Sequence, residues 1–291
     1  MRAYSRATAW ALLSPWVLAF AVFGLYPFAF SLGASLTDYS PIRAGATRFV
    51  GLANYAQACT SREFWNALAN TGWFVLGSIP FTTLAALGLA LAVQPSFRGR
   101  TPFRVGFFLP SVVSVVVLSL VFKGLYAPGG SLDALLGALH LPAPAWLQDP
   151  RTALPAIMAM DVWSASGYYM IIFLAGLESI PRDLYDAARL DGAGAWARLT
   201  TITLPLLRPT LAFVLVVNTI RSLQIFAEVF VMTRGGPLGR TTTVVYYLYE
   251  QAFSRFHLGY ASAVAWLLFA ISLLLAVVQM RAVNAREQAA R

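Results

Sequence analysis

The sequence has few of the groups from which catalytic and metal sites are built. Its 291 residues include one cysteine, two histidines and only 11% charged residues, whereas soluble domains average about 25% charged. Cys59 can form no internal disulfide, and the separated His140 and His257 offer no cluster of metal ligands. We therefore expect no metal site and no catalytic residue, and a disulfide scaffold or a disordered chain is excluded.

Apolar residues make up 58% of the chain. A transmembrane helix needs about 20 mostly apolar residues, and six stretches meet that length: 10–32, 71–94, 105–126, 154–177, 209–233 and 259–280. Membrane-spanning strands would alternate apolar and polar residues, which the valine-rich run 112–118 does not do. The sequence predicts an all-α integral membrane protein with about six transmembrane helices in a single domain, 1–291.

The arginines predict the orientation of these spans. Seven lie in the first, third and fifth loops: Arg43, Arg48, Arg62, Arg151, Arg234, Arg240 and Arg255. Twelve lie in the termini and the other two loops: Arg2, Arg6, Arg98, Arg100, Arg104, Arg182, Arg189, Arg198, Arg208, Arg281, Arg286 and Arg291. Positively charged loops stay in the cytoplasm, so both termini are expected there. Arginines scattered among apolar spans also argue against nucleic acid as a partner.

The loop between the fourth and fifth spans, 178–208, is longer than a connection between neighbouring helices requires. Pro181 suits a first helical turn, Asp183 complements a helix N-terminus, and Gly192 suits a C-terminal stop. These signals predict a short helix over 181–191, too brief to cross a membrane. Taken alone, it fits an amphipathic helix resting on lipid headgroups.

The spacing of several residues in this loop resembles a known sequence motif. Asp186-Ala187-Ala188, Gly192 and Ile202-Thr203-Leu204-Pro205 are similar to the "EAA" motif of permease subunits of ATP-binding-cassette importers, with aspartate in place of glutamate. Further segments resemble the carbohydrate branch of that family, in its maltose- and glycerol-phosphate-like first-permease type: 49–55, 100–110, 233–253 and 258–263. The resemblance runs from about 49 to 281 and implies a type I importer permease fold with a cytoplasmic coupling helix.

The resemblance also implies partners. The coupling helix of such permeases sits in a cleft of an ATPase, and the matching positions are Asp186, Ala187, Ala188, Arg189, Gly192, Leu204 and Pro205. The single lysine, Lys123, lies outside any phosphate-binding Gly-rich loop, so ATP and magnesium are expected on partner subunits, with no cofactor and no enzyme activity in this chain.

The expected assembly lies in a bacterial or archaeal cytoplasmic (inner) membrane, in contact with lipid. Its other parts are two cytoplasmic ATPase subunits, a second homologous permease that completes a heterodimer, and an extracytoplasmic solute-binding protein. The solute is expected to be sugar-like: an oligosaccharide, a polyol or a glycerol phosphate. No nucleic acid is expected to bind.

Polar residues within spans usually face a cavity or a partner. The fifth span places Asn218, Arg221, Gln224 and Glu228 along one helical face, and the fourth contributes Asp161 and aromatic residues. By the resemblance, the solute passes between these helices, and the candidate pathway residues are Tyr168, Ser222, Gln224, Arg221, Trp163 and Asn218. A purely structural bridge among Arg221, Asp161 and Glu228 remains an equal alternative.

Two other classes of membrane protein compete with this interpretation. An intramembrane serine protease would pair Ser166 with His257, but Ser166 would lie about 18 Å deep while His257 sits at the outer surface, too far for a nucleophile–base hydrogen bond. A stand-alone secondary transporter or channel remains an alternative, although it leaves the long loop without a role.

Overall fold

The computed structural model describes residues 6–42, 45, 47–94 and 99–289. Arg2, Arg43, Arg98 and Arg291, which enter the predicted orientation, lie outside the described residues. Within these ranges the chain is helical, and its one strand-like feature is an isolated bridge between Thr37 and Phe49. The predicted all-α class is confirmed.

Five helical segments are long and apolar enough to cross a membrane in the described part of the chain. They are Trp10–Ser35, Arg62–Val93, Ala153–Glu178, Arg208–Met232 and Leu258–Ala282. The elements that form them are α1 (Arg6–Phe20), η1 (Ala21–Leu25), α2 (Tyr26–Ser35), α4 (Arg62–Val93), α8 (Ala153–Glu178), α12 (Arg208–Leu223), α13 (Ala227–Met232) and α15 (Leu258–Ala289).

The predicted third span, 105–126, is not one straight helix. It consists of α5 (Arg100–Val112) and α6 (Val115–Leu125), which are bent by 95° at a short break. Val113 and Ser114 have extended backbone, with ψ of 141° and 130°, so the helical hydrogen-bond ladder stops there. Apolar composition gives the length of a span but not the direction of its backbone, which is why the sequence did not reveal the bend.

The predicted fifth span, 209–233, is also interrupted. Helix α12 ends at Leu223 and α13 begins at Ala227. Thr243 Oγ1 donates a hydrogen bond to the Ile225 carbonyl at 3.1 Å, so part of the backbone freed by the break is satisfied by a side chain. The continuous polar face expected along this span therefore ends at Gln224.

The chain divides into two compact units. The first comprises Met1–Arg62 and Tyr247–Phe269 and includes α3 (Ala53–Thr60) and η3 (Glu250–Ser254). Asn54 Nδ2 donates to the carbonyls of Ser35 and Thr37, both at 2.8 Å. A Cβ on Gly259 would fall on the Thr37 carbonyl, so α15 can approach the end of α2 this closely only with glycine at that position.

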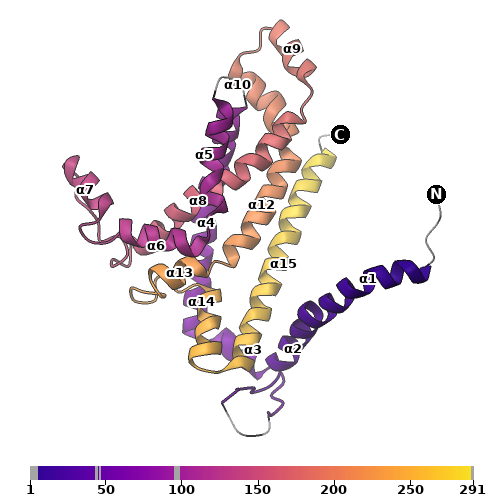
Figure 1. Ribbon diagram of the computed structural model, residues 1–291, viewed down its shortest axis with the longest axis vertical. Coiled ribbons are helices and arrows are strands. Elements are labelled where there is room, and N and C mark those ends of the chain that lie inside the picture. The colour runs from indigo at the N-terminus through magenta and orange to yellow at the C-terminus, as the bar shows by residue number, and fades with distance from the viewer. Residues whose placement is uncertain (1–5, 43–44, 46, 95–98, 290–291) are drawn as a thin grey trace. The chain divides into compact units, whose positions relative to one another are not determined.

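The second unit comprises Glu63–Tyr246 and Ala270–Arg291. Its buried side chains form two clusters, one around Tyr169, Phe173 and Leu207 and the other around Phe74 and Met160. The smaller elements of this unit are α7 (Ser131–Ala138), α9 (Arg182–Leu190), α10 (Ala195–Arg198), η2 (Leu199–Thr203) and α11 (Leu204–Leu206); α14 (Val244–Tyr249) follows α13 and runs into the first unit. Helices α9 and α10 lie at the opposite end of this unit from α13 (Figure 1).

Helices α5 and α8 approach each other closely. A Cβ on Gly167 of α8 would fall on the Phe107 carbonyl of α5. Nine residues further along α8, a Cβ on Gly176 would lie 2.5 Å from the Thr210 hydroxyl oxygen of α12. Gly167 thus lets α8 pack against the backbone of α5, and Gly176 leaves room for the side chains of Thr210 and Leu207.

Candidate functional site: a membrane cavity and an exposed loop helix

The predicted loop helix is present as α9, within one residue of its expected bounds at each end. Gly192 has φ of +76°, a conformation that disfavours residues with a Cβ. The Ala193 N–H donates to the Ala188 carbonyl at 2.8 Å and the Gly192 N–H to the Arg189 carbonyl at 3.1 Å. These two bonds form a Schellman motif, so the end of α9 is fixed by backbone geometry that only glycine adopts freely.

Helix α9 is tied to the segment that follows it. The Tyr185 hydroxyl lies 2.9 Å from Thr203 Oγ1 in η2, and Tyr185 and Ile202 pack against the buried cluster that contains Leu207. Leu207 immediately precedes α12. Packed side chains therefore connect α9 to the residue that precedes α12.

The predicted coupling residues divide by exposure. Asp186, Ala187, Arg189 and Gly192 are exposed, whereas Ala188, Leu204 and Pro205 are half-buried. Asp186 pairs with Arg189 within the helix at 2.9 Å, with both side chains largely in solvent. Such a pair contributes about 0.5 kcal/mol or less, so either side chain can be redirected to another partner at little cost.

Apolar side chains also project from this region. Leu190 is 90% exposed and Trp196 is 75% exposed. Leu184, on the same helix as Leu190, is 44% exposed. Large apolar side chains gathered on one short exposed segment are typical of a surface that binds another protein.

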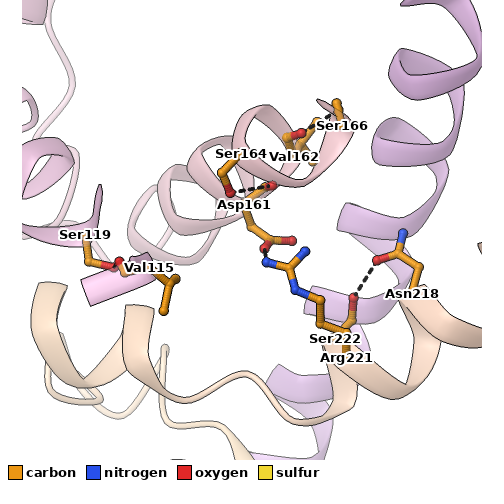
Figure 2. Close-up of polar contacts among 9 residues, drawn as sticks. All are labelled: Val115, Ser119, Asp161, Val162, Ser164, Ser166, Asn218, Arg221 and Ser222. Carbon is orange, nitrogen blue, oxygen red and sulfur yellow. Dashed lines mark hydrogen bonds and ion pairs between the residues drawn. The ribbon is translucent and has the colours of Figure 1, made fainter. Parts of the chain in front are cut away.

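An ion pair joins Arg221, a candidate pathway residue of the fifth span, to Asp161 of the fourth span. Arg221 Nη2 of α12 lies 3.0 Å from Asp161 Oδ1 of α8 (Figure 2). Asp161 is buried, while 43% of the Arg221 side chain is exposed. On the neighbouring turn of α12, Ser222 donates to Asn218 Oδ1 at 3.4 Å (Figure 2).

Two cavities share Arg221 as a lining residue. One has a volume of about 690 Å³ and is lined by Asp161, Arg221, Ser222, Gln224 and Glu228, among others. The other has about 310 Å³ and is lined by Tyr168 and Arg221, among others. Both also contact Ser111, Val113 and Val115. The break between α5 and α6 and the break between α12 and α13 therefore face the same space.

The structure brings together most, but not all, of the candidate pathway residues. Tyr168, Arg221, Ser222 and Gln224 line the two cavities that share Arg221. Trp163 lies instead in an apolar cavity of about 1190 Å³ between α4, α5 and α8, with its ring 5.4 Å from that of Phe122. Asn218 is buried and lines neither of the two cavities that contain Arg221.

The helix geometry explains this separation. Tyr168 follows Asp161 by seven residues, close to two full turns, so both occupy one face of α8. Trp163 follows Asp161 by two residues and therefore points to the opposite side. The positions that sequence reasoning missed are Ser111, Val113 and Val115, because 105–126 was expected to form one straight span although Pro110 stands three residues before Val113.

The ion pair itself can be tested by a double-mutant cycle. We expect Asp161→Asn and Arg221→Met each to lower the thermal unfolding midpoint of the purified protein, and the double variant to lose less than the sum. The expected coupling is about 1 kcal/mol, because Arg221 is partly solvated. Additive losses would show that the two charges do not stabilise each other.

Within the described residues, no group of three or more His, Cys, Asp or Glu side chains could hold a metal ion.

Comparison with known proteins gives a family. Residues 72–288 match the model of the binding-protein-dependent transport system inner membrane component. The lactose transport system permease protein LacF of Rhizobium radiobacter is 33% identical over 99% of this chain and 97% of its own. The sulfoquinovosyl glycerol transport system permease protein SmoG of Agrobacterium fabrum is 32% identical over 95% of this chain and 90% of its own.

Among solved structures, a chain of a bacterial alginate ABC transporter, in complex with an alginate pentasaccharide-bound periplasmic protein, superposes with a TM-score of 0.83. It is 23% identical, and the match covers 94% of this chain and 92% of that one. At this level of identity the likeness concerns the fold.

Proposed function

The chain belongs to the family of binding-protein-dependent transport system inner membrane components, and we propose that the two cavities that share Arg221 form part of the path of a sugar-like solute into the cytoplasm. It is a multi-pass permease subunit of an ATP-binding-cassette importer. The names of its relatives cite different solutes, lactose and sulfoquinovosyl glycerol, so they support an oligosaccharide, polyol or sugar derivative without choosing one.

The observation that carries the pathway assignment is that two broken membrane helices face one cavity, whose lining includes Asp161, Arg221 and Gln224. Backbone breaks at membrane depth are tolerated where they line a cavity or are buried in protein. In transporters, solute sites are commonly built from such discontinuous helices. Gln224 stands at the end of α12, beside Arg221 and Ser222 on the 690 Å³ cavity. Its amide can both donate to and accept from solute hydroxyls, and the Tyr168 ring can stack on a sugar face.

The second element of the proposal is the role of α9 as the coupling helix. The exposed Leu184, Leu190 and Trp196 support a docking surface for an ATPase subunit, with both termini on the same cytoplasmic side. Closure of the ATPases pushes α9, and the Tyr185–Thr203 contact and the packing of Leu207 pass that movement to α12. A rigid segment of this kind moves as a lever without melting.

The energy source lies on other polypeptides in this proposal. Two ATPase subunits hold ATP and magnesium, a second homologous permease completes a heterodimer, and an extracytoplasmic binding protein delivers the solute. The match to a binding-protein-dependent family supports the binding protein directly. The absence of a phosphate-binding Gly-rich loop with its lysine supports the location of ATP on the partners.

Reconstitution distinguishes this proposal from a stand-alone transporter. Proteoliposomes containing this chain, its partner permease, the ATPases and the binding protein are expected to import radiolabelled sugar only with internal ATP. Liposomes containing this chain alone are expected to import none. Uptake by the single chain, or uptake by the assembly without ATP, would contradict the proposal. The cognate sugar is first identified by thermal-shift screening of the binding protein.

Gln224 provides a residue-level test of the pathway. Gln224→Leu removes the amide without a large change in volume, so we expect the apparent KM for the cognate sugar to rise about tenfold while membrane abundance stays near wild type; loss of one or two hydrogen bonds accounts for this magnitude. Ile220→Leu, on the same cavity, is the matched apolar control and is expected to transport normally. Unchanged kinetics in Gln224→Leu would remove Gln224 from the pathway.

A further inference from the structure

The charged residues that line the two cavities are few. Among the described lining residues they are Arg221, Asp161 and Glu228. Arg221 contacts both cavities, and the two carboxylates line the larger one. One cation therefore faces two carboxylates, which leaves a formal charge of −1 on this wall of the pathway.

The single cation is already engaged. Arg221 Nη2 lies 3.0 Å from Asp161 Oδ1, and Asp161 is almost fully buried. A buried carboxylate that lost its cation would pay a large desolvation cost, so Arg221 stays paired with Asp161. The charge that could have attracted an anion is compensated within the chain.

The second carboxylate is fixed near the same space. Glu228 is buried and occupies the first turn of α13, directly after the break in the fifth span. Its carboxylate lines the cavity that also contains Gln224 and adds hydrogen-bond acceptors to it.

We infer that this pathway admits uncharged polyhydroxylated solutes and repels anionic sugars such as uronates, sugar phosphates and sulfonates. The inference rests on the proposed function, whose solute class it narrows. Carboxylates accept hydrogen bonds from sugar hydroxyls, whereas an anionic group close to Glu228 meets repulsion that the engaged Arg221 does not offset.

The charge of the cavity can be measured without knowing the solute. Ile220 is partly exposed on the larger cavity, so Ile220→Cys in a Cys59→Ser background places one thiol there. In the assembled transporter, the reaction rates of this thiol with a cationic and an anionic methanethiosulfonate reagent are compared, each normalised to its rate with 2-mercaptoethanol. The native Cys59, which is exposed, is the control thiol in an otherwise unaltered chain.

We expect the cationic reagent to react faster at Ile220→Cys. Glu228→Gln is expected to lower the cationic-to-anionic ratio about tenfold, the effect of one charge a few ångströms away in a partly solvated site. Asp161→Asn, which leaves Arg221 without its counter-charge, is expected to lower the ratio by a similar factor. Neither substitution should change the ratio at Cys59.

Three results would overturn the inference: a faster anionic reagent, a ratio that Glu228→Gln leaves unchanged, or a thiol that reacts with neither reagent. ATP-driven sugar uptake is measured in parallel on the Cys59→Ser assembly. Loss of uptake there with the expected reagent preference would overturn the proposed function. Intact uptake with the wrong preference would overturn this inference alone.

Discussion

Gly167→Ala is expected to lower the stability of the protein by about 3 kcal/mol or more, the upper end of the cost of overpacking a core. The added Cβ would occupy the position of the Phe107 carbonyl, so relief requires a backbone shift of α5 against α8. Side-chain rearrangement cannot provide it, because the obstacle is main chain. Size-exclusion profiles of detergent-solubilised protein after heating would measure the loss as a lower midpoint and reduced yield.

Gly106 on the facing helix gives the matched control. A Cβ at Gly106 has no neighbour within 4 Å, and alanine is favoured over glycine inside helices by about 0.5–1 kcal/mol. Gly106→Ala is therefore expected to leave the midpoint unchanged or slightly raised. If both alanine variants behaved alike, the close approach of α5 and α8 would not be a source of stability.

Much of the architecture follows from two simple regularities. Runs of apolar residues long enough to cross a bilayer give the helical class and the approximate spans, because backbone groups in lipid must be hydrogen-bonded within each segment. The extent of α9 follows from local signals, with Pro181 before the helix and Gly192 after it. The glycine of the motif is also the residue that permits the positive φ at position 192.

The breaks between α5 and α6 and between α12 and α13 could not be predicted from the sequence in the same way. Val113 and Ser114 lie in a run without glycine, three and four residues after Pro110, and Ile225 and Phe226 lie between Gln224 and Ala227. At the second break a tertiary contact takes part, because Thr243, far along the chain, satisfies the Ile225 carbonyl. The pairing of Arg221 with Asp161 was one of several options in the sequence, because both carboxylates were within the same pair of spans.

The different positions of Trp163 and Tyr168 could have been predicted from the sequence. Trp163 and Tyr168 were grouped as pathway aromatics, but counting turns from Asp161 places them on opposite faces of α8. The structure accordingly places Trp163 on the apolar cavity between α4, α5 and α8 and Tyr168 beside Arg221. Helical periodicity thus separates candidates that composition alone would merge.

The second large effect is expected at Gly192. Gly192→Val forces a β-branched residue to φ of +76°, at a cost of about 1–2 kcal/mol. No neighbour lies within 4 Å of the new Cβ, so the cost arises from the backbone alone. Helix α9 has nine residues, and a helix this short depends on its ends and its packing. The substitution should therefore shift the loop away from the conformation that fits the ATPase.

A penalty of this size reduces the population of the fitting conformation about tenfold or more. We expect sugar uptake and solute-stimulated ATPase activity to fall by that factor in reconstituted proteoliposomes, while insertion and abundance of the chain remain normal. Gly192→Asp is a milder test, because aspartate enters the left-handed region more readily than valine.

Gly194 provides the control within the same loop. It has an ordinary φ of −66°, and a Cβ there also meets no atom within 4 Å. Gly194→Val adds the same bulk to the same surface without backbone strain, so it should retain most uptake. Equal losses in the two variants would attribute the effect to bulk at the docking surface, whereas normal uptake in Gly192→Val would show that a fixed end of α9 is not needed to pass ATPase closure to α12.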